Sequence, residues 1–268
     1  MKRIVSFRLL FLLLLLASAK FVLAQSNGGR AASDLPFVVG ESLSFEGKIN
    51  KFAVSLTIGD MTLEVVNSAN GRLQLKADAR SRGTMLRWLR YSFLQEIDAV
   101  ADARDLRSIS TKKHDVQKQK VRDSIATFDY PDRKVTWVET NPNEPMQPPR
   151  TIASDLDGPT YDIVSSLYII RTLPMSVGFS TALNISDSGL VYRIPVRVAA
   201  RERQKTIFGD VWCYRVEPLV FGPGRFFEQK GKMEIWITDD ARRIPVRARV
   251  NAEVGKVDVR LKSTKNLK

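Results

Sequence analysis

From about residue 190 onward, apolar and polar residues alternate in short runs that are separated by turn residues. The run KMEIWIT at 232–238 has an apolar residue at every second position, and so does the run IPVRARV at 244–250. Successive side chains of a β-strand point to opposite faces, so this period is that of a strand with one buried face. Several such strands joined by short turns predict an antiparallel meander that closes into a sandwich or a barrel.

The same alternation, in a less regular form, begins at Phe37. The run GRLQLKADARS at 71–81 alternates Leu and Ala with polar residues, which again indicates a half-buried strand. Gly59 and Asp60 interrupt another apolar run and are expected to form a turn. Residues 84–94 combine helical spacing with aromatic residues and fit either a helix or a strand.

These patterns predict a single β domain over residues 37–263. The segment NPNEPMQPPR at 141–150 has four prolines in ten residues and is expected to be a loop. Because it falls near the middle of the domain, a division into halves at 37–140 and 151–263 stays open.

One segment has the pattern of a helix. In DGPTYDIVSSLYIIRTLP, Gly158 and Pro159 form a typical helix start, and Pro174 is expected to end the helix. The apolar residues between them form a broad surface, so we expect a helix at about 160–172. The predicted fold class is therefore mainly β: an antiparallel curved sheet, as a half-barrel or a barrel-like sandwich, with one short helix.

The N-terminus has the features of a secretory signal peptide. Basic residues precede the apolar run LLFLLLLLASA at 9–19, and Val22 and Ala24 are small residues at the cleavage positions. The alternative is a single membrane anchor, but the run is shorter than the ~20 residues that span a bilayer. We therefore predict cleavage after residue 24, a flexible leader at 25–36, and an exported protein of the periplasm or cell envelope.

The charge and the single cysteine narrow the function classes. Removing residues 1–24, which carry four basic residues and no acids, lowers the net charge from +13 to +9. Nucleic acid is a common partner of such basic chains, but export argues against it, so no nucleic-acid partner is predicted. No later run is apolar enough to span a membrane. Cys213 is the only cysteine; it excludes an intramolecular disulfide and is expected to be buried and inert.

Acidic residues provide the candidates for a catalytic or metal site. Asp239 and Asp240 lie between two alternating runs and are expected to form the turn of a β-hairpin rather than a catalytic pair. Asp155, Asp157 and Asp162 are oxygen ligands close in sequence, but their spacing does not match a calcium loop.

His114 is the only histidine and stands in a charged stretch, so we expect it to be exposed and without a special role. One histidine and one cysteine cannot form a zinc ligand set, and we find no nucleotide-binding glycine loop. The sequence thus predicts no catalytic residue, no metal and no cofactor.

Arginines on one side of the C-terminal strands form a predicted basic docking face. Arg243, Arg247, Arg249 and Arg260 occupy the polar positions of alternating runs. A cationic sheet surface attracts anionic lipid head groups or acidic polysaccharide. The alternative is a solvated surface that keeps the protein soluble.

Several segments together resemble the bacterial exported family known as domain of unknown function 3108. The resemblance covers Gly40 to Leu261, and its most specific matches lie in the helix, in the hairpin and before the last strand. They are Ser166, Leu167, Tyr168, Arg171, Ile235, Trp236, Asp239, Asp240, Pro245, Val246 and Gly255. The resemblance implies an exported, largely antiparallel β protein and implies no activity. It also implies a loose architectural similarity to periplasmic half-barrel lipid carriers.

Three functional hypotheses follow. The first is a non-enzymatic protein that binds an apolar or amphipathic ligand such as lipid in the curved sheet, with Leu167, Tyr168, Arg171 and Trp236 as ligand-binding residues. The second is a structural or interaction protein of the envelope that docks through the basic face. The third is an enzyme acting on envelope polymers. A wide apolar cavity under the helix favours the first hypothesis, a solid core with exposed aromatics the second, and a cleft that gathers the acids the third.

Overall fold

A computed structural model of the chain describes residues 35–51, 54–83, 92–222, 225–227, 229–252 and 255–268. The predicted signal peptide at 1–24, the leader up to residue 34, and residues 84–91 of the ambiguous segment lie outside this part. In the first half of the chain, the strands are β1 (Ser42–Lys51), β2 (Val54–Ala69), β3 (Arg72–Ser81), β4 (Phe93–Asp102), β5 (Ser108–Gln117), β6 (Lys120–Asp129), β7 (Lys134–Thr140) and β8 (Arg150–Asp155).

A short strand and a helix follow, and then the regular C-terminal strands. These elements are β9 (Thr160–Tyr161), α2 (Ile163–Arg171), β10 (Ser180–Asp187), β11 (Leu190–Thr206), β12 (Gly209–Pro218), β13 (Gly231–Thr238), β14 (Pro245–Ala252) and β15 (Gly255–Lys265). The predicted mainly β fold with one short helix is confirmed for the described residues.

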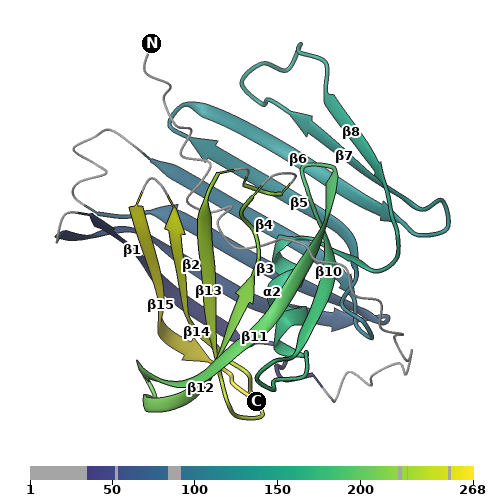
Figure 1. Cartoon of the computed structure of the whole chain (residues 1–268). Coiled ribbons are helices and arrows are strands. Elements are labelled where there is room, and N and C mark those ends of the chain that lie inside the picture. Colours follow the sequence, from purple (N-terminus) through teal and green to yellow (C-terminus); the bar gives the residue numbers. More distant parts are fainter. Residues whose placement is uncertain (1–34, 52–53, 84–91, 223–224, 228, 253–254) are drawn as a thin grey trace.

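The described strands belong to one sheet in the order β8-β7-β6-β5-β4-β3-β2-β1-β15-β14-β13-β12-β11-β10-β9. All neighbours are antiparallel except β9 and β10. The first and the last long strands therefore pair with each other in the middle of the sheet, as the purple and yellow strands do in Figure 1. The sheet curves strongly without closing, because its two end strands, β8 and β9, are not paired with each other.

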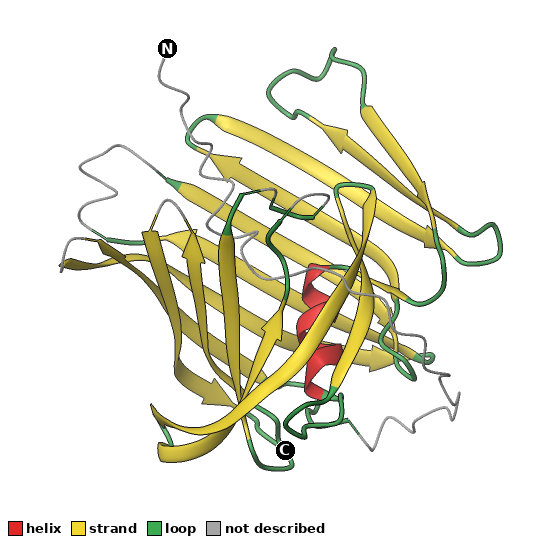
Figure 2. Ribbon diagram, in the orientation of Figure 1, coloured by secondary structure: helices red, strands yellow, loops and turns green. Residues whose placement is uncertain are grey.

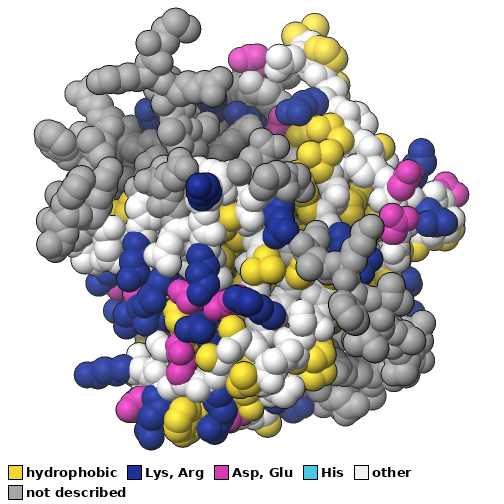
Figure 3. All heavy atoms as spheres, in the orientation of Figure 1, with side chains coloured by type: hydrophobic (Ala, Val, Ile, Leu, Met, Phe, Trp, Pro, Cys, Tyr) yellow, Lys and Arg dark blue, Asp and Glu magenta, His cyan; other side chains and the backbone are white. Residues whose placement is uncertain are grey.

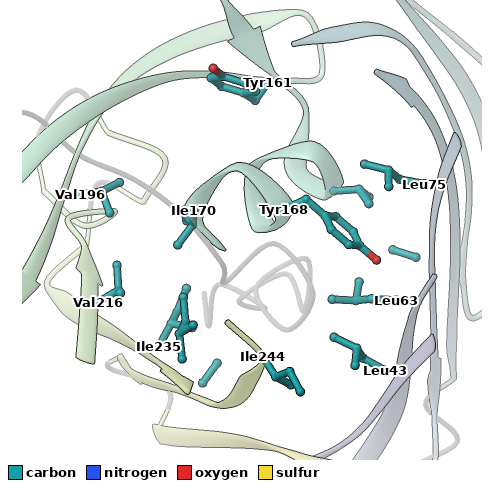
Figure 4. Packing of buried hydrophobic residues seen from close by; sticks show 14 of the residues in the cluster. Leu43, Leu63, Leu75, Tyr161, Tyr168, Ile170, Val196, Val216, Ile235 and Ile244 are labelled. Carbon is teal, nitrogen blue, oxygen red and sulfur yellow. The ribbon is translucent and has the colours of Figure 1, made fainter. Parts of the chain in front are cut away.

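Helix α2 lies inside this curve, surrounded by strands (Figure 2). Its buried residues Val164, Tyr168 and Ile170 belong to the main hydrophobic core, together with inward-facing apolar residues of the strands. Tyr168 points toward Leu43, Leu63 and Leu75, whereas Ile170 points toward the opposite side, where Ile235 lies (Figure 4). The helix therefore fills the interior of the curved sheet.

A second, smaller core stabilises the end of the sheet that is formed by β6, β7 and β8. It contains Phe128, Val135, Trp137 and Leu156, and Val191 of β11 packs against it. At this junction the turn between β10 and β11 rests on β7 and β8, and the Ser154 hydroxyl donates a 2.7 Å hydrogen bond to the Gly189 carbonyl. Side-chain packing here brings the two unpaired ends of the sheet together.

Two local predictions need correction. The expected turn at Gly59 and Asp60 is wrong, because β2 runs through both residues and pairs Gly59 with Gly47 of β1. A Cβ at Gly59 would lie only 2.6 Å from the Arg80 carbonyl oxygen, so close strand packing explains the glycine. The helix is confirmed but begins three residues later than expected, because Asp162 caps it and residues 160–161 form β9.

Candidate ligand site

The first turn of α2 is fixed by Asp162. Its Oδ1 accepts hydrogen bonds from the backbone N–H groups of Val164 and Ser165, at 2.8 and 3.0 Å. Its Oδ2 accepts hydrogen bonds from the hydroxyls of Ser165 and of Ser108 on β5. The carboxylate thus satisfies donors that a helix N-terminus leaves unpaired and joins the helix to the sheet.

The last turn of α2 is fixed by Arg171. Its guanidinium forms a bidentate ion pair with Glu41, and both side chains are essentially inaccessible to solvent. It also donates 3.0 Å hydrogen bonds to the carbonyls of Arg242 and Arg243 in the β13–β14 turn. This side chain therefore joins the helix to the segment before β1 and to the hairpin.

Tyr168 lies in the core beside Arg171. Its ring meets Phe37 edge to face, with 4.8 Å between the ring centroids. Burial raises the pKa of the Tyr168 hydroxyl, and the described residues offer that hydroxyl no hydrogen-bond partner. The predicted ligand-binding residues Tyr168 and Arg171 therefore pack into the protein interior, in the C-terminal half of α2.

An apolar pocket lies between α2 and the sheet, and we call it the α2 pocket. Its volume is about 30 Å³. Leu167 and Ile170 line it from the helix, which places the predicted residue Leu167 at the pocket. The strands contribute Phe45, Met61, Leu63, Ile235, Ile237, Pro245, Arg247, Ala248 and Val259.

A second pocket of similar volume, which we call the polar pocket, lies at the other end of α2. Its lining includes Asp162 and Ile163 at the helix start, residues 186–188 at the end of β10 and in the turn that follows, and inward-facing residues of β4 to β7. The strand residues are Ile97, Thr111, Lys113, Ser124, Ala126, Phe128 and Trp137. Lys113 Nζ lies 3.6 Å from Asp187 Oδ1 across this pocket.

Sequence reasoning missed the polar pocket. The sequence of β5 could have indicated it. The run STKKHDVQ has polar or charged residues at most positions of both faces, whereas β3 and β4 have an apolar inward face. A strand that is polar on both sides but pairs within a sheet must place polar groups in the interior.

Trp236, the remaining predicted ligand-binding residue, lies on the outer face of β13, away from both pockets. It is only 2% exposed because the guanidinium groups of Arg247 and Arg249 each lie 5.1 Å from its ring centroid. Its indole N–H donates a hydrogen bond to Glu202. Trp236 is therefore covered by neighbouring charged side chains.

Three of the four arginines of the predicted basic docking face, Arg247, Arg249 and Arg260, take part in ion pairs. Arg247 and Arg260 both contact Asp258, at 2.7 and 3.1 Å, and Arg249 lies 3.8 Å from Glu234. Burial opposes ionisation of Asp258, but hydrogen bonds and charges from Arg247 and Arg260 outweigh it and lower the pKa of Asp258. In Figure 3, basic and acidic side chains are accordingly interspersed at the lower left of the molecule.

Arg243 differs from the other three, because it lies in the β13–β14 turn and has a positive φ of 48°. The predicted turn at Asp239 and Asp240 is confirmed. Arg201 contacts Asp239 at 2.6 Å, and Arg242 contacts Asp240 at 2.7 Å. Burial works against ionisation of Asp240, yet the hydrogen bonds from Arg242 and Thr238 hold the pKa of Asp240 below its usual value.

The other acidic candidates are dispersed. Asp157 is exposed and pairs with Arg133, Asp155 is exposed on β8, and Asp162 is the buried helix cap. Within the described parts of the chain, no three His, Cys, Asp or Glu side chains are arranged to hold a metal ion. Likewise, no helix of these parts has the length and apolar character needed to cross a bilayer.

Cys213 and His114 occupy opposite environments. Cys213 is fully buried, as predicted, and burial together with nearby Asp240, Asp239 and Glu202 raises the pKa of its thiol to about 12. His114 is partly exposed, and its Nδ1 lies 2.5 Å from Asp123 Oδ1. Neither side chain lines either pocket.

A family model for proteins of unknown function, DUF3108, matches residues 46–262. The chain belongs to this family. The match confirms the predicted resemblance, and it contains β2 to β14 in full together with α2. No curated protein matches this DUF3108 chain in sequence.

Solved structures show where this DUF3108 fold recurs. A β-barrel-like protein of domain of unknown function DUF1849 from Brucella abortus matches with a TM-score of 0.57 and 13% identity, over 86% of this chain and 99% of that one. At this identity the likeness shows the fold alone.

Two further matches are more distant. An exported protein with a YmcC-like fold from Bacteroides fragilis has a TM-score of 0.32 and 10% identity, over 86% and 98% of the two chains. A lipoprotein from Parabacteroides distasonis has a TM-score of 0.31 and 13% identity, over 87% and 99%. These two scores are too low to support any argument.

Proposed function

We propose that the chain is an exported, non-enzymatic protein of the cell envelope that binds the apolar part of an amphipathic ligand, such as a lipid, in the α2 pocket. The observation that carries this proposal is the lining of that pocket, in which nearly every residue is apolar. A concave apolar site between a helix and a curved sheet is typical of binding sites for apolar groups. The signal-peptide pattern supports the envelope location.

The volume of the α2 pocket limits what it holds in this conformation. A cavity of about 30 Å³ has room for one or two water molecules or for the end of an apolar chain. Met61 and Leu167 are only partly buried, and methionine adapts its shape readily. A longer chain therefore requires Met61 and Leu167 to move aside, which partly buried side chains do at lower cost than core residues.

The arrangement of charged groups favours binding over the two alternatives. An enzyme needs titratable groups that are available to a substrate. Asp239 and Asp240 are held by arginines, and in the polar pocket Asp162 caps the helix while Asp187 lies 3.6 Å from Lys113. Docking through the basic face needs cations available to a partner. Arg247, Arg249 and Arg260 already contact Asp258 or Glu234, which weakens their attraction for an anionic surface.

The first test is the content of the protein as it comes from the cell. The mature protein is purified without detergent from its native envelope, extracted with organic solvent and analysed by mass spectrometry. We expect a lipid in stoichiometric amount. A protein that is empty after gentle preparation, and that also fails to bind cis-parinaric acid, would exclude this function and favour the docking alternative.

A matched pair of variants tests whether the ligand binds in the α2 pocket. Ala248 lines the α2 pocket, whereas Ala153 is exposed on β8. Ala248→Leu fills the cavity and should weaken the binding of cis-parinaric acid about tenfold, which corresponds to about 1.4 kcal/mol of lost contact. Ala153→Leu should leave the affinity unchanged. Circular dichroism confirms that both variants are folded, and equal affinities would place the ligand elsewhere.

A further inference from the structure

The inward-facing side chains of the sheet change from apolar to polar between β4 and β5. Residues paired across neighbouring strands share a face, so Lys113 lies on the inward face with its partner Ile97. By the same register, Ser124 and Arg122 of β6 face inward beside β5. The inward residues of β3 are Leu or Ala, and those of β4 from Ile97 onward are Ile or Ala. By contrast, the inward residues Thr111 and Lys113 of β5 and Arg122 and Ser124 of β6 are charged or carry a hydroxyl.

We propose that Lys113, Arg122 and Ser124 bind the anionic head group, a phosphate or a carboxylate, of the amphipathic ligand. This inference rests on the proposed function, because it assigns the polar part of the same ligand. Lys113 pairs with Ser124, and Arg122 is the next inward residue along β6, so the two cations are diagonal neighbours with Cα atoms roughly 7–8 Å apart. Two cations with a hydroxyl between them form charge-assisted hydrogen bonds to an anion.

The present partners of these cations are held at long distances. Lys113 lies 3.6 Å from Asp187, and Arg122 lies 3.9 Å from Asp115. Each acid has a second neighbour, since the Ser188 hydroxyl donates to Asp187 and the Gln117 amide donates to Asp115. The acids therefore keep a hydrogen bond when the cations turn toward a ligand.

A buried polar atom near these cations also lacks a partner. Thr111 Oγ1, in the lining of the polar pocket, is buried without a hydrogen bond in the described structure. Buried polar groups are normally hydrogen-bonded, and the Thr111 hydroxyl is able to donate a hydrogen bond to an anion in the polar pocket.

One face of α2 contributes lining residues to both the polar pocket and the α2 pocket. Ile163, Leu167 and Ile170 follow the i, i+4, i+7 spacing and share a helix face. Ile163 lines the polar pocket, and the other two line the α2 pocket. At 1.5 Å per residue the seven steps span about 10 Å. An alkyl chain along this face joins a head group at Lys113 to the apolar lining at Leu167.

The test compares ligands that differ only in the head group. Dodecyl phosphate and dodecanol, below their aggregation limits, compete with cis-parinaric acid for the full mature protein. We expect dodecyl phosphate to bind about tenfold more tightly or better, the effect of a charge-assisted hydrogen bond. In Lys113→Gln with Arg122→Gln this preference should disappear. Lys112→Gln, at an exposed neighbour on the opposite face, should keep it.

Each other result contradicts the inference in a distinguishable way. Equal binding of both ligands, or a preference that survives the double variant, would overturn the head-group site and leave the proposed function intact. Failure of both ligands to bind would overturn the proposed function as well. Inorganic phosphate, titrated alone by calorimetry, should bind weakly, and an affinity equal to that of dodecyl phosphate would assign the site to free phosphate instead. If the double variant does not fold, Arg122→Gln alone is used.

Discussion

At the scale of single residues, Arg171 joins the last turn of α2 to distant parts of the chain. Its guanidinium donates to Glu41 and to the carbonyls of Pro36, Arg242 and Arg243, which come from two separate parts of the chain, the segment before β1 and the β13–β14 turn. The planar fork of arginine forms these bonds simultaneously, and a lysine would not. Because the ion pair is buried, its desolvation cost is balanced only while both partners are present.

We expect Arg171→Met to destabilise the protein strongly, because it leaves the Glu41 carboxylate buried without a counter-ion. The free energy of unfolding should fall by about 3–5 kcal/mol, the usual cost of removing one partner of a buried ion pair. Urea unfolding followed by tryptophan fluorescence measures this change. The double variant Arg171→Met with Glu41→Leu should recover much of the loss, since no unpaired charge remains.

Equal losses in the single and the double variants would show that the contacts to Arg242 and Arg243, rather than the buried charge, carry the stability. The sequence indicated Arg171 as a residue of interest but gave no means of pairing it with Glu41, which is 130 residues away. Trp236 illustrates the same limit. Alternation placed it on a polar face, but its cover by Arg247 and Arg249 depends on the register between β13 and β14.

At the scale of elements, α2 depends on the Asp162 cap. We expect Asp162→Ala to lower the free energy of unfolding by about 2–4 kcal/mol, which combines a lost helix cap with a buried Ser108 hydroxyl left without its acceptor. Asp157→Ala is the matched control, because the Asp157 side chain is 85% exposed and its pair with Arg133 lies at the surface. That change should stay within about 0.5 kcal/mol. Equal effects of the two substitutions in urea unfolding would contradict this role of the cap.

Strands and the helix were predictable where one simple period dominates. The runs that became β13 and β14 alternate cleanly, and the apolar surface of α2 is broad. Prediction failed at Gly59, where a glycine that permits close strand packing has the same sequence signal as a turn glycine. The polar inward face of β5 was not predicted either, because a strand with polar residues on both faces shows no apolar alternation that would tell its inward face from its outward one.

At the scale of the whole molecule, the order of the strands in the sheet could not be predicted from the sequence. Alternation predicts strands and short turns predict their antiparallel neighbours, but neither predicts that β1 pairs with β15 or that the sheet curves around α2. The position of the polar pocket follows from this arrangement. Its lining joins β4 to β7 with the β10–β11 turn across the two unpaired ends of the sheet.

Gly189 offers a direct test of how these ends are held together. It forms the β10–β11 turn with Ser188, has a φ of 79°, and lies against Trp137 and Ile152. A Cβ at this position would come within 2.9 Å of the Cβ atoms of both residues. Gly209 is a matched control, because its φ is 86° but a Cβ there would meet no atom within 4 Å.

Both Gly189→Ala and Gly209→Ala should cost roughly 1–2 kcal/mol of stability, because alanine disfavours a positive φ. Gly189→Ala should cost about 1–3 kcal/mol more, since the added methyl group displaces β7 and β8 from the turn. Hydrogen exchange measured by mass spectrometry should then become faster in residues 134–140 and 150–155 of this variant only. If instead the two variants lose equal stability and β7 and β8 keep their protection, the ends of the sheet are held by the chain connection from β8 to β9, and packing at Gly189 contributes nothing.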